Sequence, residues 1–233
     1  MILQSSFVRV VVCTAIFSAI VHAQDTVAAV EKPIDQQRVL GVLPNFRTAD
    51  GSQPFSPITP KQKMTIAMKD SFDGPVYLIA GAFASLYQLE DQNPSYGQGM
   101  KGYAKRYGSA YGDQAIGNLM TEGIIPSVFH QDPRYFRMGA GGGSTGHRLK
   151  YAVSRVLIAK NDKGNWTFNS PEWVGNAAAV AISNVYYPDD TRNATDNATK
   201  LCIQVATDAF SNVLKEFWPD WKQKFFHKKN APQ

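Results

Sequence analysis

The chain of 233 residues contains only two cysteines, and Cys13 lies within an apolar run close to the N-terminus. If that run belongs to a cleaved signal peptide, Cys202 is left alone and no intramolecular disulfide can form. The remaining chain of about 210 residues must then be stabilised by its hydrophobic core, and it is long enough for one domain of ordinary size.

The sequence also lacks the signatures of several protein classes. It has 24 Lys and Arg against 19 Asp and Glu, but outside the C-terminus no basic block is interleaved with aromatic residues, which argues against a nucleic-acid partner. There is no G-x-S-x-G element, and the glycines of 139–143 are not followed by the Gly-Lys-Ser/Thr of a phosphate-binding loop. Cys202 lies among aliphatic residues and is expected to be inert. We therefore expect no metal and no cofactor.

Residues 1–23 have the pattern of a secretory signal peptide. Arg9 is their only charge, the apolar run 10–21 follows it, and Val21 and Ala23 occupy the −3 and −1 positions of a small-residue cleavage site. The run is too short to span a bilayer. The pattern predicts an exported protein, located in the periplasm or associated with the outer membrane.

Prolines and turn-forming residues characterise residues 24–58, which we expect to be an extended lead-in. Thr59 and Pro60 then provide an N-cap and a first helical residue, and segments of helical pattern follow one another with almost no strand alternation. Only the segment 161–170 indicates a loop or a small hairpin. The predicted fold is an all-α bundle of about six helices, in a helical domain of residues 59–217.

Glycine is unusually frequent in the segment 96–125, which nevertheless keeps helical spacing. Each glycine inside a helix costs about 0.5–1 kcal/mol relative to alanine, which is tolerable where another helix backbone packs closely. Two rows of small residues are predicted to make such close contacts: Ala104, Gly108, Gly112 and Ala115 in this segment, and Gly175, Ala179 and Ser183 further on. A row of tyrosines, Tyr103, Tyr107 and Tyr111, lies beside the first of them.

For two other helical segments the sequence predicts which residues are buried. The uncharged run 75–89 is short for a bilayer, so we expect a core helix buried in protein, with burial in lipid as the alternative. In the helix over 147–160, Arg148 is expected to point outward or to form an ion pair. The residues expected to face inward are Leu149, Val153 and Val156 or Leu157.

The segment PSVFHQDPRYFRMGAGGG, residues 126–143, joins two predicted helices and places His130, Asp132 and Arg134 at alternate positions. In a structural interpretation, the prolines interrupt the helix, Asp132 makes a turn, and Arg134 pairs with a carboxylate or caps helix carbonyls. In a functional interpretation, these side chains converge with His147 to bind a metal or phosphate, or to catalyse a reaction. A lone HxD pattern has little specificity for a metal, so we favour the structural interpretation.

The last long helix is predicted to begin at Asp190 or Thr191 and to end at Pro219. It has polar side chains at every fourth position: Lys200, Gln204, Asp208, Asn212 and Glu216. We favour the interpretation that this row is a solvated face with a ladder of ion pairs.

The alternative is that Asp208 and Asn212 turn inward, where Arg106, Arg155 or Asn184 would satisfy them. Such a network would fix the register of the helix or bind a polar ligand. The candidate ligand-binding residues are therefore Arg106, Arg155, Asp208 and Asn212.

Residues 218–233 combine aromatic residues with lysines, as membrane-surface anchors do. The candidates for contact with a membrane surface are Trp218, Trp221, Lys222, Lys224, Phe225 and Phe226. The alternative is a C-terminal flap whose aromatic residues pack on the bundle. The one-sided charge favours the membrane surface.

Four motifs in this order resemble a family of exported bacterial proteins, chiefly from acidobacteria, that has no assigned activity. They are YGQGMKGYAKRYGSAYGD (96–113), HQDPRYF (130–136), ISNVYYP (182–188) and NVLKEFWPD (212–220). The resemblance extends from Val39 to Asp220, implies a location in the bacterial envelope, and transfers no catalytic residues.

We therefore expect a non-catalytic exported envelope protein with a structural, lipid-binding or ligand-binding role, whose partner is a membrane surface or an envelope lipid. The alternative is an envelope hydrolase that acts on a phosphorylated lipid or glycan through His130, Asp132, Arg134 and His147.

Overall fold

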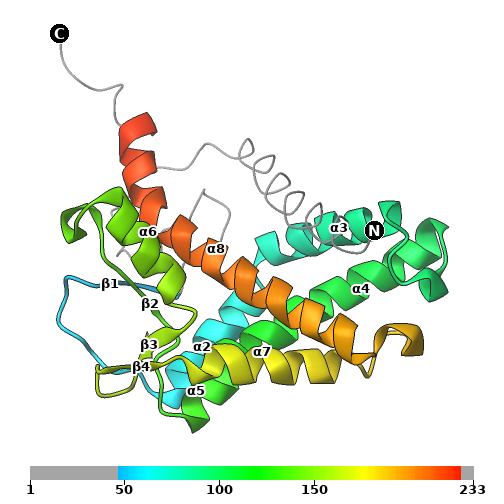
Figure 1. Ribbon diagram of the computed structural model, residues 1–233, viewed down its shortest axis with the longest axis horizontal. Helices are drawn as coiled ribbons and strands as arrows, with labels where there is room; N and C mark the ends of the chain where they lie inside the picture. Colours follow the sequence, from blue (N-terminus) through cyan, green and yellow to red (C-terminus); the bar gives the residue numbers. More distant parts are fainter. Residues whose placement is uncertain (1–46, 227–233) are drawn as a thin grey trace.

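The computed structural model describes residues 47–226, which form the predicted all-α bundle of about six helices with two small sheets beside it (Figure 1). The helices are α2 (Pro60–Ser71), α3 (Gly74–Leu89), α4 (Gly99–Asn118), the π-helical segment η4 (Leu119–Ile124), α5 (Ile125–Val128), α6 (Thr145–Ser154), α7 (Ser170–Ser183) and α8 (Ala194–Phe226). The 3-10 turns are η3 (Pro94–Tyr96), η5 (Ala140–Gly142) and η6 (Asp189–Thr191). The strands are β1 (Thr48–Asp50), β2 (Tyr135–Arg137), β3 (Ile158–Lys160) and β4 (Trp166–Phe168).

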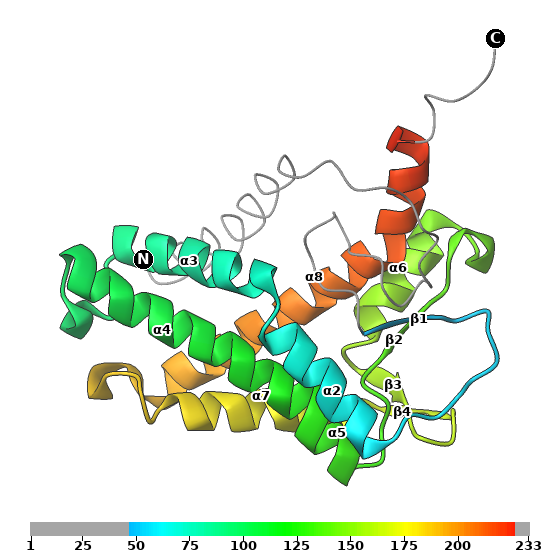
Figure 2. The ribbon, with the colours of Figure 1, turned by 180° about the vertical axis from the view of Figure 1, so that it is seen from behind.

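The helices pack against one another around a common core. Helices α3 and α4 run side by side, α7 packs against α4, and α8 packs against α7 and α6 (Figures 1 and 2). The π-helical segment η4 lies between α2 and α7 and contacts both. The strands β1 and β2 pair in parallel, while β3 and β4 form an antiparallel hairpin, which confirms the hairpin option for residues 161–170.

The helix starts follow from capping residues. Thr59 and Gln62 form a capping box ahead of Pro60, in which Gln62 accepts from the Thr59 backbone N–H at 2.8 Å, and this confirms the predicted start of α2. Helix α7 is capped by Asn169, whose Oδ1 accepts from the backbone N–H of Glu172 at 3.2 Å. Helix α8 starts at Ala194, later than predicted, because Asn193 caps it by accepting from the backbone N–H of Asp196 at 2.9 Å.

The predicted end of the last helix is wrong, because α8 continues through Pro219 to Phe226. A proline inside a helix cannot donate to the carbonyl four residues earlier and disturbs the backbone ladder there. Next to that position, the Glu216 carbonyl accepts from Arg137 Nε at 3.0 Å and from Arg148 at 2.9 Å. These two bonds hold the helix one residue beyond the Lys215 carbonyl, the one to which Pro219 cannot donate.

The glycine-rich segment is helical, as predicted, but the first half of its row of small residues does not face another helix. Ala104 and Gly108 are exposed, and a Cβ atom added at Gly108 would meet nothing within 4 Å. The tyrosines make the contact instead: Tyr103 donates to the Gly81 carbonyl of α3 at 3.3 Å, and Tyr111 stacks on Tyr77. The prediction of a close contact is therefore wrong for Ala104 and Gly108. The second half of the row does meet other segments: a Cβ atom at Gly112 would lie 3.4 Å from the Tyr186 ring, and Ser71 of α2 donates to the Ala115 carbonyl at 3.2 Å.

The second row of small residues is confirmed. Gly175, Ala179 and Ser183 are buried on α7. A Cβ atom at Gly175 would lie 2.9 Å from Thr121 Cγ2 and 3.0 Å from Thr121 Cα of η4. Only a residue without a side chain allows this approach.

Helix α3 exposes several of its apolar side chains. On α3, Ala80 and Ala84 are buried, but Leu78 is 61% and Leu89 85% exposed, so the helix lies at the edge of the bundle rather than at its centre. Within residues 47–226, no helix combines the length and the apolar character needed to cross a membrane.

The expected orientation of α6 is wrong for most of its predicted inner row. Leu149, Val153 and Leu157 are exposed, whereas Arg148 is buried and Val156 alone of the row faces inward. The reason is that α8 offers carboxylates to α6: Arg148 donates to Glu216 at 2.8 Å and lies 2.6 Å from Asp220.

Candidate functional site

A cavity of about 510 Å³ opens between α3, α4 and α8. Its walls are largely apolar: α3 contributes Val76, Ile79, Phe83 and Leu86, and α8 contributes Ile203, Phe210 and Leu214. The predicted polar row of α8 also reaches it, since Lys200 and Asp208 are lining residues. This volume and this mixture of an apolar wall with a few polar groups are typical of sites for small molecules.

One end of the cavity is strongly charged, and we call it the charged end. It is lined by Arg47 ahead of β1, Asp70 of α2, Glu122 of η4, and Asp208 and Lys215 of α8. Segments far apart in the sequence therefore meet at one point. Behind it, Glu172 and Asn176 of α7 are buried, and Asn176 Nδ2 donates to Glu172 at 3.1 Å and lies 3.5 Å from Asp208.

The charged end contains one well-formed ion pair. Arg47 donates to Glu122 Oε1 at 2.7 Å, and its Nε donates to the Pro133 carbonyl at 3.1 Å. The Glu122 side chain is only 2% exposed. Among residues 47–226, no hydrogen-bond donor reaches the buried oxygens Asp70 Oδ1 and Glu122 Oε2.

Two carboxyl groups of this end hold their protons unusually strongly. Burial raises the pKa of Asp70 well above its ordinary value, and the neighbouring charge of Glu122 raises it further. Burial likewise raises the pKa of Glu172, with Asp208 as the second cause. A proton on Asp70 or Glu172 lets that group donate to its carboxylate neighbour, which removes the repulsion within each pair.

Lys215 lies buried beside these carboxyl groups. Burial lowers the pKa of Lys215 to about 8, and the nearby positive charge of Arg47 lowers it too. When Asp70 and Glu172 carry protons, the cations Arg47 and Lys215 balance the carboxylates Glu122 and Asp208. A buried cluster with these six groups is then neutral, which is the state that a low-dielectric site favours.

The opposite end of the cavity joins two of the motifs. Asp113 closes YGQGMKGYAKRYGSAYGD, and it accepts from Tyr186 at 2.6 Å and from Tyr187 at 2.7 Å, the two tyrosines of ISNVYYP. Burial raises the pKa of Asp113 although both hydroxyl groups donate to it. The Lys200 ammonium lies 3.4 Å from the centre of the Tyr187 ring. Asp113, Tyr187 and Lys200 all line the cavity.

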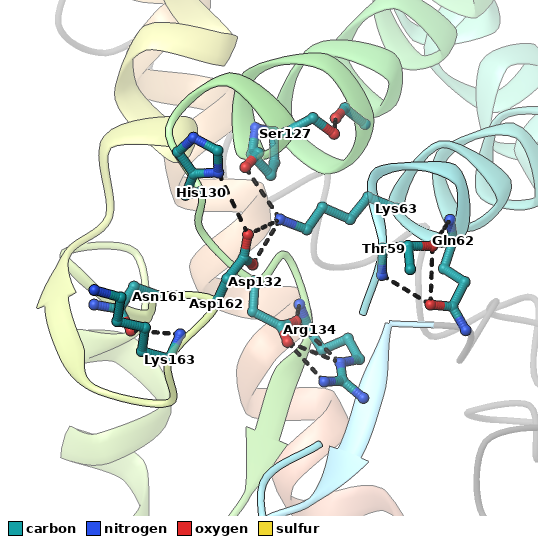
Figure 3. Close-up of polar contacts among 12 residues, drawn as sticks. Thr59, Gln62, Lys63, Ser127, His130, Asp132, Arg134, Asn161, Asp162 and Lys163 are labelled. Atoms are coloured by element: carbon teal, nitrogen blue, oxygen red, sulfur yellow. Dashed lines mark hydrogen bonds and ion pairs between the residues drawn. The ribbon is translucent and has the colours of Figure 1, made fainter. Parts of the chain in front are cut away.

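The predicted corner adopts the structural arrangement (Figure 3). Asp132 is buried and pairs with Arg134 through Oδ2 at 2.6 Å, and its Oδ1 accepts from the Arg134 backbone N–H. His130 is exposed and lies 3.9 Å from Asp162, which accepts from the buried Lys63 at 2.6 Å. Within the described residues, no hydrogen bond or ion pair joins Asp132 or Arg134 to either histidine.

Backbone geometry accounts for His130. Its φ is +54°, and the next residue, Gln131, donates its backbone N–H to the Pro126 carbonyl at 2.9 Å. This combination is a Schellman-type helix end with a left-handed residue after the cap. His147 lies in the first turn of α6, where its backbone N–H donates to Ser144 at 3.3 Å. Among the described residues, no group of three metal-binding side chains is arranged to hold an ion.

The candidate ligand-binding residues are separated. Arg106 is buried, but it donates to the carbonyls of Gln92 at 2.9 Å and Gly97 at 2.6 Å and so clamps the loop before α4. Arg155 lies between the rings of Tyr151 and Trp166, at 4.2 and 4.3 Å from their centres. Neither arginine pairs with the polar row of α8.

The polar row itself turns inward, so the interpretation as a solvated face is wrong. Asn212 is 5% exposed and Glu216 is completely buried. Glu216 accepts from Tyr135 at 2.8 Å, from the backbone N–H groups of Met138 and Gly139, and from Arg148. This carboxylate ties β2, α6 and α8 together.

Sequence reasoning missed most of the charged end. Arg47, Asp70, Glu122 and Lys215 were not among the candidates, because they stand alone in segments with no shared motif. The available signal was Glu122 itself, a single carboxylate in the otherwise uncharged run NLMTEGII. A lone acid in an apolar helix needs a partner, which here comes from Arg47.

The candidates for a membrane surface are only partly covered by the structure. Trp218 is half-buried, and Trp221 is 41% exposed and stacks on Phe217. The side chains of residues 222–226 and the whole of 227–233 lie outside the described part, as do the signal-peptide pattern and residues 24–46. Membrane contact stays a prediction.

Comparison of the chain with protein-family models, with curated proteins and with solved structures finds no match.

Proposed function

We propose that this protein is a non-catalytic, exported binding protein that holds an amphiphilic, lipid-like molecule in the cavity between α3, α4 and α8. The observation that carries the proposal is the division of the cavity into an apolar wall and a charged end. An apolar tail along α3 and α8 would replace water there, and a polar head group would lie against the buried charges.

A binding role is also supported by the state of the predicted catalytic corner. Asp132 and Arg134 satisfy each other, and His130 ends a helix. The export part of the proposal rests on the signal-peptide pattern of residues 1–23, and the association with a membrane on the aromatic and basic tail.

Displacement of a fluorescent probe tests the binding role. The protein lacking residues 1–23 is mixed with N-phenyl-1-naphthylamine, a neutral probe that fluoresces in apolar sites, and 1-dodecanol is added as a competitor. We expect probe binding that dodecanol reverses. Ile203→Trp, which fills the cavity wall, is expected to weaken binding by about tenfold or more, equivalent to about 1.4 kcal/mol.

The matched control is Ile182→Trp on α7, which introduces the same side chain at an exposed position away from the cavity. This variant is expected to bind the probe like the wild type. If the folded wild type does not bind the probe, or if both variants bind equally well, the cavity is not a binding site for apolar molecules.

Cell fractionation tests the location. The full chain is expected in the envelope fraction, and a chain that ends at Trp221 is expected to be released more readily as soluble protein. Recovery of the full chain in the cytosol would contradict export.

A further inference from the structure

We infer that the cavity selects an amphiphile with a cationic, hydrogen-bond-donating head group, an alkylammonium, which binds against Asp70 and Glu122. The inference rests on the proposed function and specifies its ligand class. It starts from two buried oxygens of residues that line one cavity; within residues 47–226 neither oxygen has an N–H or hydroxyl donor.

Asp70 Oδ1 and Glu122 Oε2 are the acceptors in question. Both residues line the cavity, Asp70 is 7% and Glu122 2% exposed, and neither oxygen has a hydrogen-bond donor among the described residues. A buried carboxylate oxygen without a donor is costly, on the order of 1–3 kcal/mol. Apart from a proton shared between the two carboxyl groups, the described residues supply no donor to either oxygen, so a donor that enters from the cavity can take the place of that proton.

Charge decides which donor fits best. The groups that face this point from all surrounding elements are Arg47, Asp70, Glu122, Glu172, Asp208 and Lys215. They comprise four carboxyl groups and two cations. If all four carboxyl groups were ionised, the set would carry an excess of negative charge, which the free protein balances with protons on Asp70 and Glu172. An ammonium group can replace one of these protons, whereas the carboxylate of a fatty acid would need a further one.

The hydrogen-bond inventory leads to the same choice. An ammonium group has three N–H donors and no acceptor, so it can serve Asp70 and Glu122 together, while an alcohol has a single donor. Glu122 Oε1 is already occupied by Arg47, which leaves Oε2 for the ligand. The tail of the ligand would then follow Val76, Ile79 and Leu214 along the apolar walls.

The binding event exchanges one cation for another. In the free protein a proton on Asp70 removes one of the two negative charges of its pair with Glu122, and the alkylammonium takes over that role. The proton leaves to the solvent, so binding releases protons and strengthens as the pH rises from mildly acidic values. Binding weakens again above about pH 10, where the amine itself loses its charge.

Three competitors of equal chain length test the inference in the same probe displacement: dodecylammonium, 1-dodecanol and dodecanoate. At about pH 7 we expect dodecylammonium to bind at least about tenfold more tightly than dodecanol, as charge-assisted hydrogen bonds are the stronger ones. Dodecanoate is expected to bind no better than dodecanol.

Asp70→Asn is expected to remove most of the preference for dodecylammonium over dodecanol. The matched control is Asp196→Asn, which removes an equal charge from a lining residue that is not fully buried. It is expected to retain the preference. Circular dichroism establishes that each variant is folded.

A measurement on the wild type keeps the inference testable if Asp70→Asn does not fold. Titration calorimetry with dodecylammonium in two buffers of different ionisation enthalpy, at about pH 6, counts the protons released; we expect a net release of protons on binding. No proton release, or a preference for dodecanol or dodecanoate, overturns the inference and leaves the proposed binding role intact. If none of the three competitors binds, the proposed function fails as well.

Discussion

His130 illustrates how a backbone position can select a residue. Its φ of +54° is in the left-handed region, where the Cβ atom approaches the following carbonyl and an L-residue loses about 1–2 kcal/mol. Histidine is one of the residues enriched there after glycine, asparagine and aspartate. The imidazole is 85% exposed. The position therefore depends on the helix end more than on imidazole chemistry.

Substitution of His130 separates these two contributions. His130→Gly is expected to retain or slightly increase the free energy of unfolding, because glycine adopts this conformation without strain. His130→Val is expected to lower it by about 1–2 kcal/mol, since a β-branched residue is strained there. Urea denaturation measures both. An equal loss in the two variants would show that the imidazole itself stabilises the corner.

The side chain of Glu216 is expected to contribute more to the free energy of unfolding than that of His130. Its carboxylate is fully buried and receives donors from Tyr135, from two backbone N–H groups and from Arg148. Glu216→Ala leaves Arg148 buried with its charge less well paired, and we expect a loss of about 3–5 kcal/mol in the free energy of unfolding.

The control for Glu216 is Asp189→Asn, which removes a carboxylate that is 91% exposed and pairs with Arg192. Surface ion pairs of this kind contribute about 0–1 kcal/mol. If thermal or urea unfolding gives similar losses for both variants, the buried network does not stabilise the protein in the way described.

At the scale of the elements, the sequence indicates where helices begin better than which side of them is buried. Thr59 and Pro60 predict the start of α2 because capping is local chemistry. The orientation of α6 depends on Glu216, which is far away in the sequence, so an apolar row at helical spacing turned out to be its outer face. The cavity was not predictable for the same reason, since its charged end draws on separate segments.

Two glycines provide a matched test of helix packing. Gly175→Ala places a methyl group within about 3 Å of Thr121, and we expect overpacking to lower the free energy of unfolding by about 1–3 kcal/mol. Gly108→Ala adds the same methyl group in open space on α4 and is expected to stabilise by about 0.5–1 kcal/mol. The urea midpoints should move in opposite directions. A stabilising Gly175→Ala would contradict the close contact of α7 with η4.

At the scale of the whole molecule, the charged end couples folding to pH. It joins the segment before β1 with α2, η4, α7 and α8, so its protonation state affects the interior of the bundle as a unit. Asp70 and Glu172 have raised pKa values in the fold because burial disfavours their charged forms. In the unfolded chain they titrate near about pH 4. The folded protein therefore holds protons that the unfolded chain has already lost.

This difference fixes the sign of the pH dependence. The two protons stabilise the fold fully below about pH 4, and their contribution is lost as the pH rises through the raised pKa values. The double variant Asp70→Asn with Glu172→Gln carries neutral groups at both positions and has no such loss. Relative to the wild type, it should therefore gain stability steadily between about pH 4 and pH 7. Urea unfolding at several pH values measures this difference. Titrating groups outside the cluster are the same in both proteins, so their contributions cancel in the comparison. Asp189→Asn, which removes a carboxyl group outside the cluster, serves as the control. If the difference in free energy of unfolding between the double variant and the wild type does not change over this pH range, both carboxyl groups are ionised in the fold. The charged end of the cavity then carries a net negative charge.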